Sequence, residues 1–319
     1  MTVIGSDLNE AARLLTAGQL VAIPTETVYG LAANALNPEA VLRIFEVKER
    51  PSFDPLIVHV NSIAALQEYA SSVPPQALAL AQEFWPGPLT LVLPKKDIIP
   101  DLVTSGLPGV GLRMPAHPLA LSLLRQLPFP LAAPSANPFG YISPTLPQHV
   151  YRQLQGKIPY ILDGGPCTIG VESTIVGFEG DEVLVYRLGG LPFEHIQRIV
   201  PGAQLRLNAS SNPAAPGMLL SHYAPRKPLL LGEIEKLLEM HPGRRTAVLS
   251  FRRDFSDIPG VSACEVLSPS GDLHEAAAHL FAAMRRLDEA DLDLILAEPV
   301  PDTGIGRAVN DRLRRASAE

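Results

Sequence analysis

The sequence predicts an α/β protein with two domains, a larger one over residues 1–201 and a smaller one over residues 228–319. Three observations lead to this prediction. Short aliphatic runs alternate with amphipathic segments along most of the chain. Residues 202–227 interrupt the pattern with Asn, Ser, Pro and Gly and have little periodicity, which is typical of a linker. Beyond them, strand-like and helix-like segments alternate again, as in a small parallel, Rossmann-like sheet.

The composition sets limits on function. The 319 residues carry a net charge of −7, which argues against a broad duplex-binding face, because such a face needs clustered Lys and Arg. Cys167 and Cys264 lie far apart, so neither a disulfide framework nor a zinc site is expected. The N-terminal stretch lacks a basic segment followed by a long apolar one, and no run of 18 apolar residues occurs. We therefore expect a soluble, cytoplasmic protein without a membrane partner.

In the first domain, a helix is expected in DLNEAARLLTAG, which has an Asp-x-x-Glu capping pattern and ends at Gly18. QLVAIP reads as a strand, and PEAVLRIFEVKER reads as a helix with Pro38 in its first turn. Further strands are expected in PLIVHV, LTLVLP, GVGLRM, PLAAPS, YILDGG, STIVGF and EVLVYR.

In the second domain, strands are expected in PLLLG, TAVLSF and DLILAEPV, and helices in EIEKLLEM, DLHEAAAHLFAAMRRL and GRAVNDRLRRA. The chain has no GxxxxGK[ST] motif, so P-loop chemistry is excluded. His274 and His279 are five residues apart on the expected helix and face different ways, so they do not form a zinc helix.

Several polar residues fall near the ends of expected elements. The cations are Lys48, Arg50, Arg113 and Arg187, and the short hydrogen-bonding groups are Ser135, Asn137, Ser143 and Ser173. Each alone has an ordinary explanation as a helix-end charge, a turn residue or a solvated strand end. Because ligands of α/β folds gather at such ends, the set together suits a polyanion and a small polar zwitterion.

Six stretches in order carry a family resemblance. They are PTETVYGLAANA, KERPSFDPLIVHV, WPGPLTLVL, GVGLRMPAH, APSANPFGYISPT and GVESTIV. Together they resemble the YrdC-like family of threonylcarbamoyl-AMP synthases, whose KxR…SxN signature appears as Lys48-Glu49-Arg50 and Ser135-Ala136-Asn137. PGMLLSHYAP and GIGRAVNDRLRRA resemble the long, two-domain members. The resemblance implies a YrdC-like mixed α/β domain with a concave pocket, followed by the smaller Rossmann-like domain.

The resemblance also implies a nucleotidyltransferase reaction. L-threonine, bicarbonate and ATP would give threonylcarbamoyl-AMP and pyrophosphate, with Mg²⁺ accompanying ATP and no metal held by the protein itself. A downstream enzyme would transfer the threonylcarbamoyl group to adenosine 37 of tRNA, so tRNA would be only an indirect partner.

The resemblance and the charges together assign the site. Lys48 and Arg50 are expected to be catalytic. The ATP-binding set is Lys48, Arg50, Ser52, Ser135, Asn137, Ser143, Arg187 and His222, and the threonine-binding set is Thr25, His59, Arg113 and Ser173. Arg113 suits a carboxylate because a guanidinium can hold it through two hydrogen bonds. Tyr29 is either a pocket residue or a packing residue, and the carboxylate of Glu26 would repel ATP unless it pairs with a cation.

Residues 213–227 are expected to fold over the nucleotide as a lid with His222 near the phosphates, since this stretch is apolar and proline-rich rather than flexible. Alternatively, its apolar side chains join the two domains. Two other functions stay open: an RNA-binding module, and a carbamoyl-adenylate enzyme related to hydrogenase maturation. The scarcity of aromatic residues counts against the first.

Overall fold

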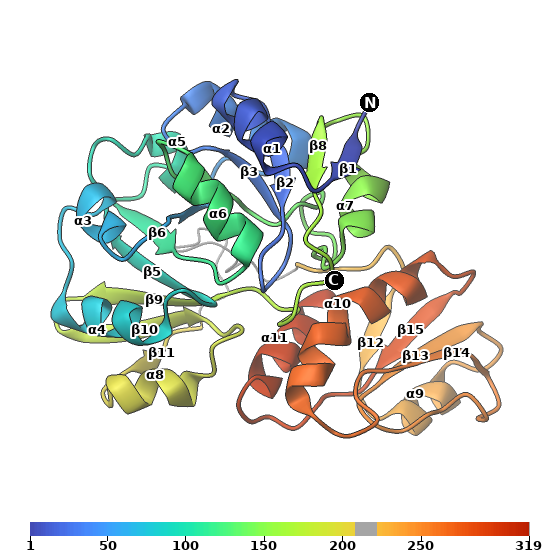
Figure 1. The fold of residues 1–319 in the computed structure, drawn as a ribbon. Helices are drawn as coiled ribbons and strands as arrows, with labels where there is room; N and C mark the ends of the chain where they lie inside the picture. Colours follow the sequence, from blue (N-terminus) through green and yellow to red (C-terminus); the bar gives the residue numbers. More distant parts are fainter. Residues whose placement is uncertain (208–221, 319) are drawn as a thin grey trace. The chain divides into compact units, whose positions relative to one another are not determined.

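The chain forms two compact units in the computed structural model, which describes residues 1–207 and 222–318 (Figure 1). The first unit holds residues 1–139, 144–168 and 172–207, and the second holds residues 140–143, 169–171 and 222–318. Two short segments from the N-terminal part of the sequence thus group with the second unit. One of them contains Ser143, which was expected in the first domain.

The first unit is built on a mixed sheet of eleven strands in the order β1-β8-β2-β3-β7-β4-β6-β5-β9-β10-β11. Its strands are β1 (Val3–Gly5), β2 (Val21–Ile23), β3 (Gly30–Asn34), β4 (Ile57–His59), β5 (Leu89–Pro94), β6 (Gly109–Arg113), β7 (Leu131–Ala132), β8 (Tyr160–Leu162), β9 (Thr174–Glu179), β10 (Glu182–Arg187) and β11 (Gln204–Leu205). Strands that neighbour in the sheet are often distant in sequence, so the sheet collects residues from the whole unit.

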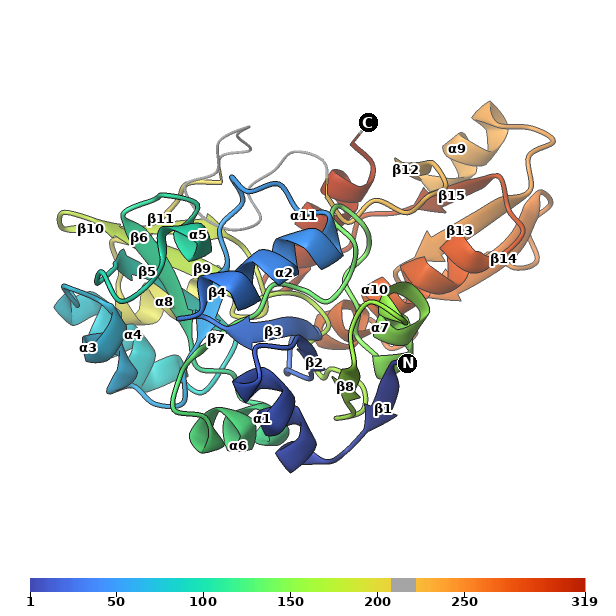
Figure 2. The same cartoon turned by 90° about the horizontal axis from the view of Figure 1, so that it is seen from above.

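Helices cover both faces of this sheet. They are α1 (Leu8–Thr16), α2 (Pro38–Lys48), α3 (Ala65–Tyr69), α4 (Pro75–Phe84), α5 (Asp101–Thr104), α6 (Pro118–Gln126), α7 (Pro147–Leu154) and α8 (Phe193–Ile199). Around β2 and β3, helices α1 and α6 lie on one face and α2 on the other (Figure 2). The α1–α6 side is an apolar core in which Leu15, Ile23 and Leu123 are fully buried.

Helix α2 begins and ends where its sequence indicates. The Asn37 side chain accepts hydrogen bonds from the backbone N–H groups of Glu39 and Ala40, and Pro38 occupies the first turn. At the other end Glu49 has a φ of 55°, and the N–H of Arg50 donates to the carbonyl oxygen of Phe45. This left-handed residue closes the helix in a Schellman turn. Lys48 therefore stays on the buried side of the last turn, while Arg50 enters the following loop.

The second unit is a parallel, Rossmann-like sheet of four strands in the order β12-β15-β13-β14. Its elements are β12 (Leu229–Leu231), α9 (Ile234–Met240), β13 (Thr246–Ser250), β14 (Val261–Val266), α10 (Leu273–Glu289), β15 (Leu294–Ala297) and α11 (Gly306–Ala316). The expected strand–helix alternation is confirmed. Strand β14 was not predicted from the sequence, because this edge strand is half-exposed and shows no clear alternation of apolar residues.

The end of the predicted lid is anchored in the second unit. Tyr223 is 1% exposed, has a φ of 67° and stacks on Phe281 with ring centroids 5.4 Å apart. The guanidinium groups of Arg312 and Arg315 lie 5.1 and 5.8 Å from the centre of its ring. The earlier part of the predicted lid, residues 213–221, lies outside the described residues, so lid closure stays a prediction.

Among the described helices, none has the length and apolar character needed to cross a bilayer.

Candidate functional site

The candidate site lies along one edge of the first sheet. Strands β4, β6, β5, β9 and β10 are neighbours in this order, and their directions bring the ends of β4, β6 and β10 beside the starts of β5 and β9. Residues at this edge are His59, Thr90, Arg113, Ser173 and Arg187, all of them buried. Four of the five were predicted as site residues, although they come from widely separated parts of the sequence.

His59 stands next to Arg113 in this edge. Its imidazole is 2% exposed, and its Nδ1 has no hydrogen-bond partner within residues 1–207 and 222–318. Burial, reinforced by the positive charge of Arg113, lowers the pKa of His59 to about 3. The ring is therefore neutral at pH 7, and its buried Nδ1 lacks a partner among the described residues.

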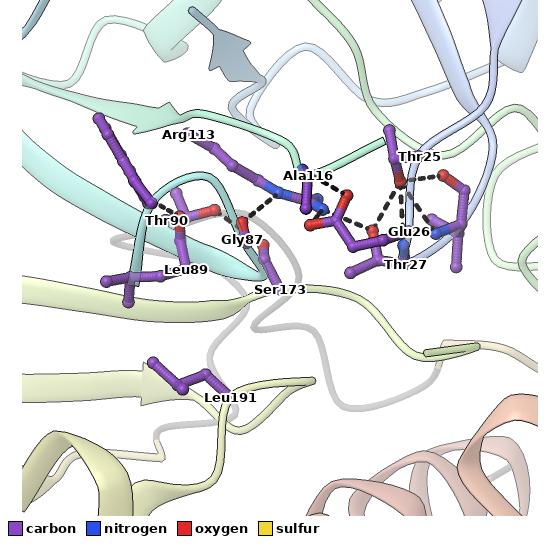
Figure 3. A network of polar contacts seen from close by, with 12 residues as sticks. Thr25, Glu26, Thr27, Gly87, Leu89, Thr90, Arg113, Ala116, Ser173 and Leu191 are labelled. Atoms are coloured by element: carbon purple, nitrogen blue, oxygen red, sulfur yellow. Dashed lines mark hydrogen bonds and ion pairs between the residues drawn. The ribbon is translucent and has the colours of Figure 1, made fainter. Parts of the chain in front are cut away.

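Arg113 is held by a buried network (Figure 3). Its Nη2 donates to Glu26 Oε1 at 2.7 Å and to Thr27 Oγ1 at 2.9 Å, and its Nε donates to the carbonyl oxygen of Gly87 at 3.4 Å. The Arg113 and Glu26 side chains are 5% and 8% exposed. The hydrogen bonds of the described residues leave Nη1 unused. A guanidinium fixed in this way can offer that nitrogen to a carboxylate.

The two threonines of PTET differ in their surroundings. The Thr25 hydroxyl lies 2.8 Å from Thr27 Oγ1 and donates to the carbonyl oxygen of Val28 at 2.6 Å. The same hydroxyl accepts from the backbone N–H groups of Thr27 and Val28, so Thr25 closes its own turn. Thr27, which was not in the predicted threonine-binding set, contacts Arg113 instead. The contact predicted between Thr25 and threonine stays a prediction; the hydroxyl of Thr27, not that of Thr25, accepts from Arg113.

A second polar network joins β5, β9 and β10. Ser173 Oγ lies 2.7 Å from Thr90 Oγ1, and Arg187 donates from Nε and Nη2 to the carbonyl oxygen of Ser173 at 3.0 and 2.9 Å. Arg187 Nη2 also donates to Ser173 Oγ at 3.1 Å. From the sequence, Ser173 was expected to bind threonine and Arg187 to bind ATP; in the structure the two residues are in direct contact.

Lys48 has a structural contact in addition to any role with phosphate. It is 1% exposed, and its Nζ donates to the carbonyl oxygens of Ser135 and Asn137, each at 2.5 Å. Burial lowers the pKa of Lys48 well below its usual range, with Arg50 as the next cause. The two halves of the KxR…SxN signature are therefore joined, with the lysine shaping the loop after β7.

Arg50 is braced in the loop that follows α2. Its Nη2 lies 2.8 Å from Asp54 Oδ2 in an ion pair whose two side chains are 6% and 1% exposed. Nε and Nη2 also donate to the carbonyl oxygens of Asp54 and Pro55 at 3.0 and 2.9 Å. The guanidinium carbon lies 5.9 Å from the centre of the Phe139 ring. Asp54 was missed by sequence reasoning, although an acid between a KxR motif and a buried strand was the available signal.

The remaining predicted residues differ in their exposure and in the unit to which they belong. Ser52 is exposed in a turn, and Ser135 is half-buried in the loop after β7. Ser143 is buried in the second unit, where its carbonyl oxygen accepts from Arg285 Nε at 3.3 Å. His222 is also buried in that unit, with its ring 4.2 Å from that of Tyr223. The described part of the chain contains no group of three or more His, Cys, Asp or Glu side chains suited to a metal ion.

Comparison with known proteins shows which family the chain resembles. A family model for Sua5, YciO and YrdC, described as "Telomere recombination", matches residues 13–189, and one described as "Threonylcarbamoyl-AMP synthase, C-terminal domain" matches residues 191–318. The chain belongs to the Sua5/YciO/YrdC family. Its two matched parts correspond to the two-domain form of that family.

Two relatives and one solved structure of the Sua5/YciO/YrdC family match most of the chain. The threonylcarbamoyl-AMP synthase of Bacillus subtilis is 43% identical over 97% of this chain and 92% of its own length. That of Pyrococcus abyssi is 42% identical over 96% of this chain and 93% of its own. The crystal structure of P. abyssi Sua5 complexed with L-threonine superimposes with a TM-score of 0.92 and 40% identity, covering 99% of this chain and 97% of that one. The two-domain α/β fold expected from the sequence is thus confirmed.

Proposed function

We propose that this protein is a threonylcarbamoyl-AMP synthase, a nucleotidyltransferase that converts L-threonine, bicarbonate and ATP into threonylcarbamoyl-AMP and pyrophosphate. Its family and the activity named for its full-length relatives support this function. The observation that carries the proposal is the buried Arg113, which has a free Nη1 among the described residues and stands beside a neutral histidine. A guanidinium next to an unpartnered imidazole nitrogen suits the carboxylate and hydroxyl of a small amino acid.

We assign threonine to the His59–Arg113 end of the site. The Arg113 guanidinium would hold the threonine carboxylate, and Thr27 and Ser173 would contribute hydroxyl contacts. His59 has a partnerless Nδ1 and would bond the threonine hydroxyl without adding a second positive charge. The P. abyssi relative was crystallised with L-threonine, which agrees with this choice of ligand.

The nucleotide would lie toward the KxR and SxN residues. Arg50 and Arg187 supply positive charge, and the loop at Ser135 and Asn137 is held in shape by Lys48. Ser52, Ser143 and His222 stay predictions as further nucleotide contacts. Mg²⁺ would enter with ATP, because this ion is commonly held by substrate phosphates and water rather than by a dedicated protein cage.

The reaction then depends on positioning. Bicarbonate supplies CO₂ by losing hydroxide, and the threonine amine adds this CO₂ and loses a proton to become a carbamate, so that one water is released. A carbamate oxygen then attacks the α-phosphorus of ATP as pyrophosphate leaves. Both reactants are anionic, so fixed cations must lower the repulsion between them. Holding two reactants in line can remove roughly 7–11 kcal/mol from a barrier in favourable systems. The product would pass to an enzyme that modifies tRNA in the cytoplasm.

One assay tests the proposed function. The purified protein is incubated with ATP, Mg²⁺, L-threonine and bicarbonate, and pyrophosphate release is measured while each component is omitted in turn. We expect release to require both threonine and bicarbonate, and mass spectrometry to detect threonylcarbamoyl-AMP. Pyrophosphate release that ignores either compound would reject the proposal.

A further inference from the structure

Glu26 is the one acidic side chain in the PTET turn, and both of its carboxylate oxygens are occupied. Oε1 accepts from Arg113 Nη2 at 2.7 Å, and Oε2 accepts from the backbone N–H of Ala116 at 3.0 Å. Figure 3 shows the Glu26 side chain between the Arg113 guanidinium and the backbone at Ala116. Glu26 therefore links the turn between β2 and β3 to the loop that follows β6.

In this arrangement the Glu26 carboxylate does not itself bind a ligand. Its residue exposure is 6%, and each oxygen already has a donor. A carboxylate beside an anionic substrate such as ATP would repel that substrate unless a cation compensates for its charge. The carboxylate is thus best understood through the group that it holds, which is Arg113.

Holding Arg113 has a geometric consequence. Glu26 and Thr27 both use Nη2, and Gly87 takes Nε, so the plane of the guanidinium is fixed by three acceptors. The nitrogen that remains among the described atoms is Nη1. A carboxylate binds an arginine best when the N–H directions are already aligned, because less side-chain entropy is then lost on binding.

We propose that Glu26 is a positioning residue for threonine: it orients Arg113 so that Nη1 faces the threonine carboxylate. This inference rests on the proposed function, since threonine is the ligand that it concerns. Glu26 has a second, opposite effect, because its charge partly neutralises Arg113 and thereby weakens the attraction for an anion. The proposal is that orientation outweighs this neutralisation.

Glu26→Gln separates the two effects. The amide has nearly the same shape and keeps one acceptor oxygen, but its NH₂ group opposes either the Arg113 N–H or the Ala116 N–H. We expect the KM for threonine to rise about tenfold or more, as for the loss of a hydrogen bond to a charged group, while the KM for ATP changes less than about twofold. Calorimetric titration with threonine should show the same loss of affinity without any turnover.

Two further variants make the test specific. Glu26→Asp keeps the charge but shortens the side chain, so it should fold readily and raise the threonine KM by a smaller factor. In Arg113→Lys the forked group is absent, so adding Glu26→Gln should raise the threonine KM no further. Glu10→Gln is the matched control, because Glu10 also pairs with an arginine, Arg13 at 2.7 Å, but on the exposed surface of α1.

The outcomes are distinct. A Glu26→Gln protein that binds threonine as tightly as the wild type, or more tightly, would show that orientation does not dominate and would overturn the proposal. Equal losses for threonine and ATP, or effects of Glu26→Gln and Arg113→Lys that simply multiply, would overturn it as well. If the wild-type protein itself binds no threonine, the proposed function fails instead.

Discussion

His59 and Arg113 are partners in the register of the parallel strands β4 and β6. In parallel neighbours, residues in register project to the same face of the sheet, so the imidazole and the guanidinium share one environment. That environment is buried and already holds one positive charge. It explains why His59 is neutral, and it makes the stability of the protein depend on pH.

Acidification should destabilise the first unit through His59. Its pKa is about 3 when folded and about 6.5 when unfolded, so below pH 6.5 the unfolded chain binds a proton that the folded chain rejects. Stability is therefore lost as the pH falls through this window, by about 2 kcal/mol between pH 6.5 and pH 5 for this one group. Denaturant unfolding followed by the fluorescence of the single tryptophan, Trp85 in the first unit, measures the loss.

His59→Gln should remove this part of the pH dependence. The half-buried His195 in the same unit offers a control, and His195→Gln should leave most of the slope in place. An unchanged slope in His59→Gln would mean that other groups cause the acid sensitivity.

Arg113→Ala should damage threonine use more than ATP use. Loss of hydrogen bonds from a charged group corresponds to a rise of roughly 10- to 100-fold in the threonine KM. The variant also leaves the Glu26 carboxylate buried without its cation, so its melting temperature should fall. Steady-state kinetics with each substrate varied in turn measure the split, and equal losses for both substrates would reject the assignment of Arg113 to threonine.

Lys48→Ala should lower kcat and ATP use and also reduce stability. The substitution deprives the buried carbonyl oxygens of Ser135 and Asn137 of their donor, at a cost of roughly 1–3 kcal/mol for each unsatisfied group. Lys157→Ala is a suitable control because Lys157 has a 45% exposed side chain. A fully stable Lys48→Ala protein with normal ATP kinetics would contradict both roles.

Asp54→Asn should raise the KM for ATP while leaving that for threonine within about twofold. The amide keeps the shape of the carboxylate but loses the ion pair that braces Arg50, and one buried charged contact contributes about 1.5–3 kcal/mol. Asp101→Asn is the matched control, since Asp101 pairs with Lys95 through an 81% exposed side chain. If Asp54→Asn instead raised the KM for threonine and left the KM for ATP unchanged, Arg50 would be assigned to threonine rather than to ATP.

Thr27→Val and Thr25→Val should have different effects. Thr27→Val removes the hydroxyl that contacts Arg113 and should raise the threonine KM, whereas Thr25→Val breaks the local turn and should mainly lower the melting temperature.

The specificity of the wild-type protein for its amino-acid substrate gives another test. Serine should be turned over only modestly less well than threonine, because one buried methyl group contributes about 1 kcal/mol. Valine should be a poorer substrate still, because it lacks the hydroxyl group. Equal turnover of valine and threonine would contradict a hydrogen bond between the protein and the threonine hydroxyl.

The sequence by itself determined the α/β class, the order of most strands, the helices α1, α2, α9, α10 and α11, and the family. These features are local or depend on motif order: Pro38 begins α2, Gly18 follows α1, and the six stretches appear in the order of the family. The sequence also selected Arg113, because an arginine in an apolar strand must find an anion or water. Strand β14 was missed because a half-exposed edge strand has a weak pattern.

Only the tertiary structure decided which residues lie together. The strand order β4-β6-β5-β9-β10 brings His59, Arg113 and Ser173 to one edge, and no local pattern encodes that order. The structure also showed that the residues of PTET have different roles: Thr25 closes the turn, while Glu26 and Thr27 accept hydrogen bonds from Arg113. The spacing of residues in the sequence could not show these different roles, because the partners of Glu26 are about 90 residues away and approach it only when the sheet is assembled.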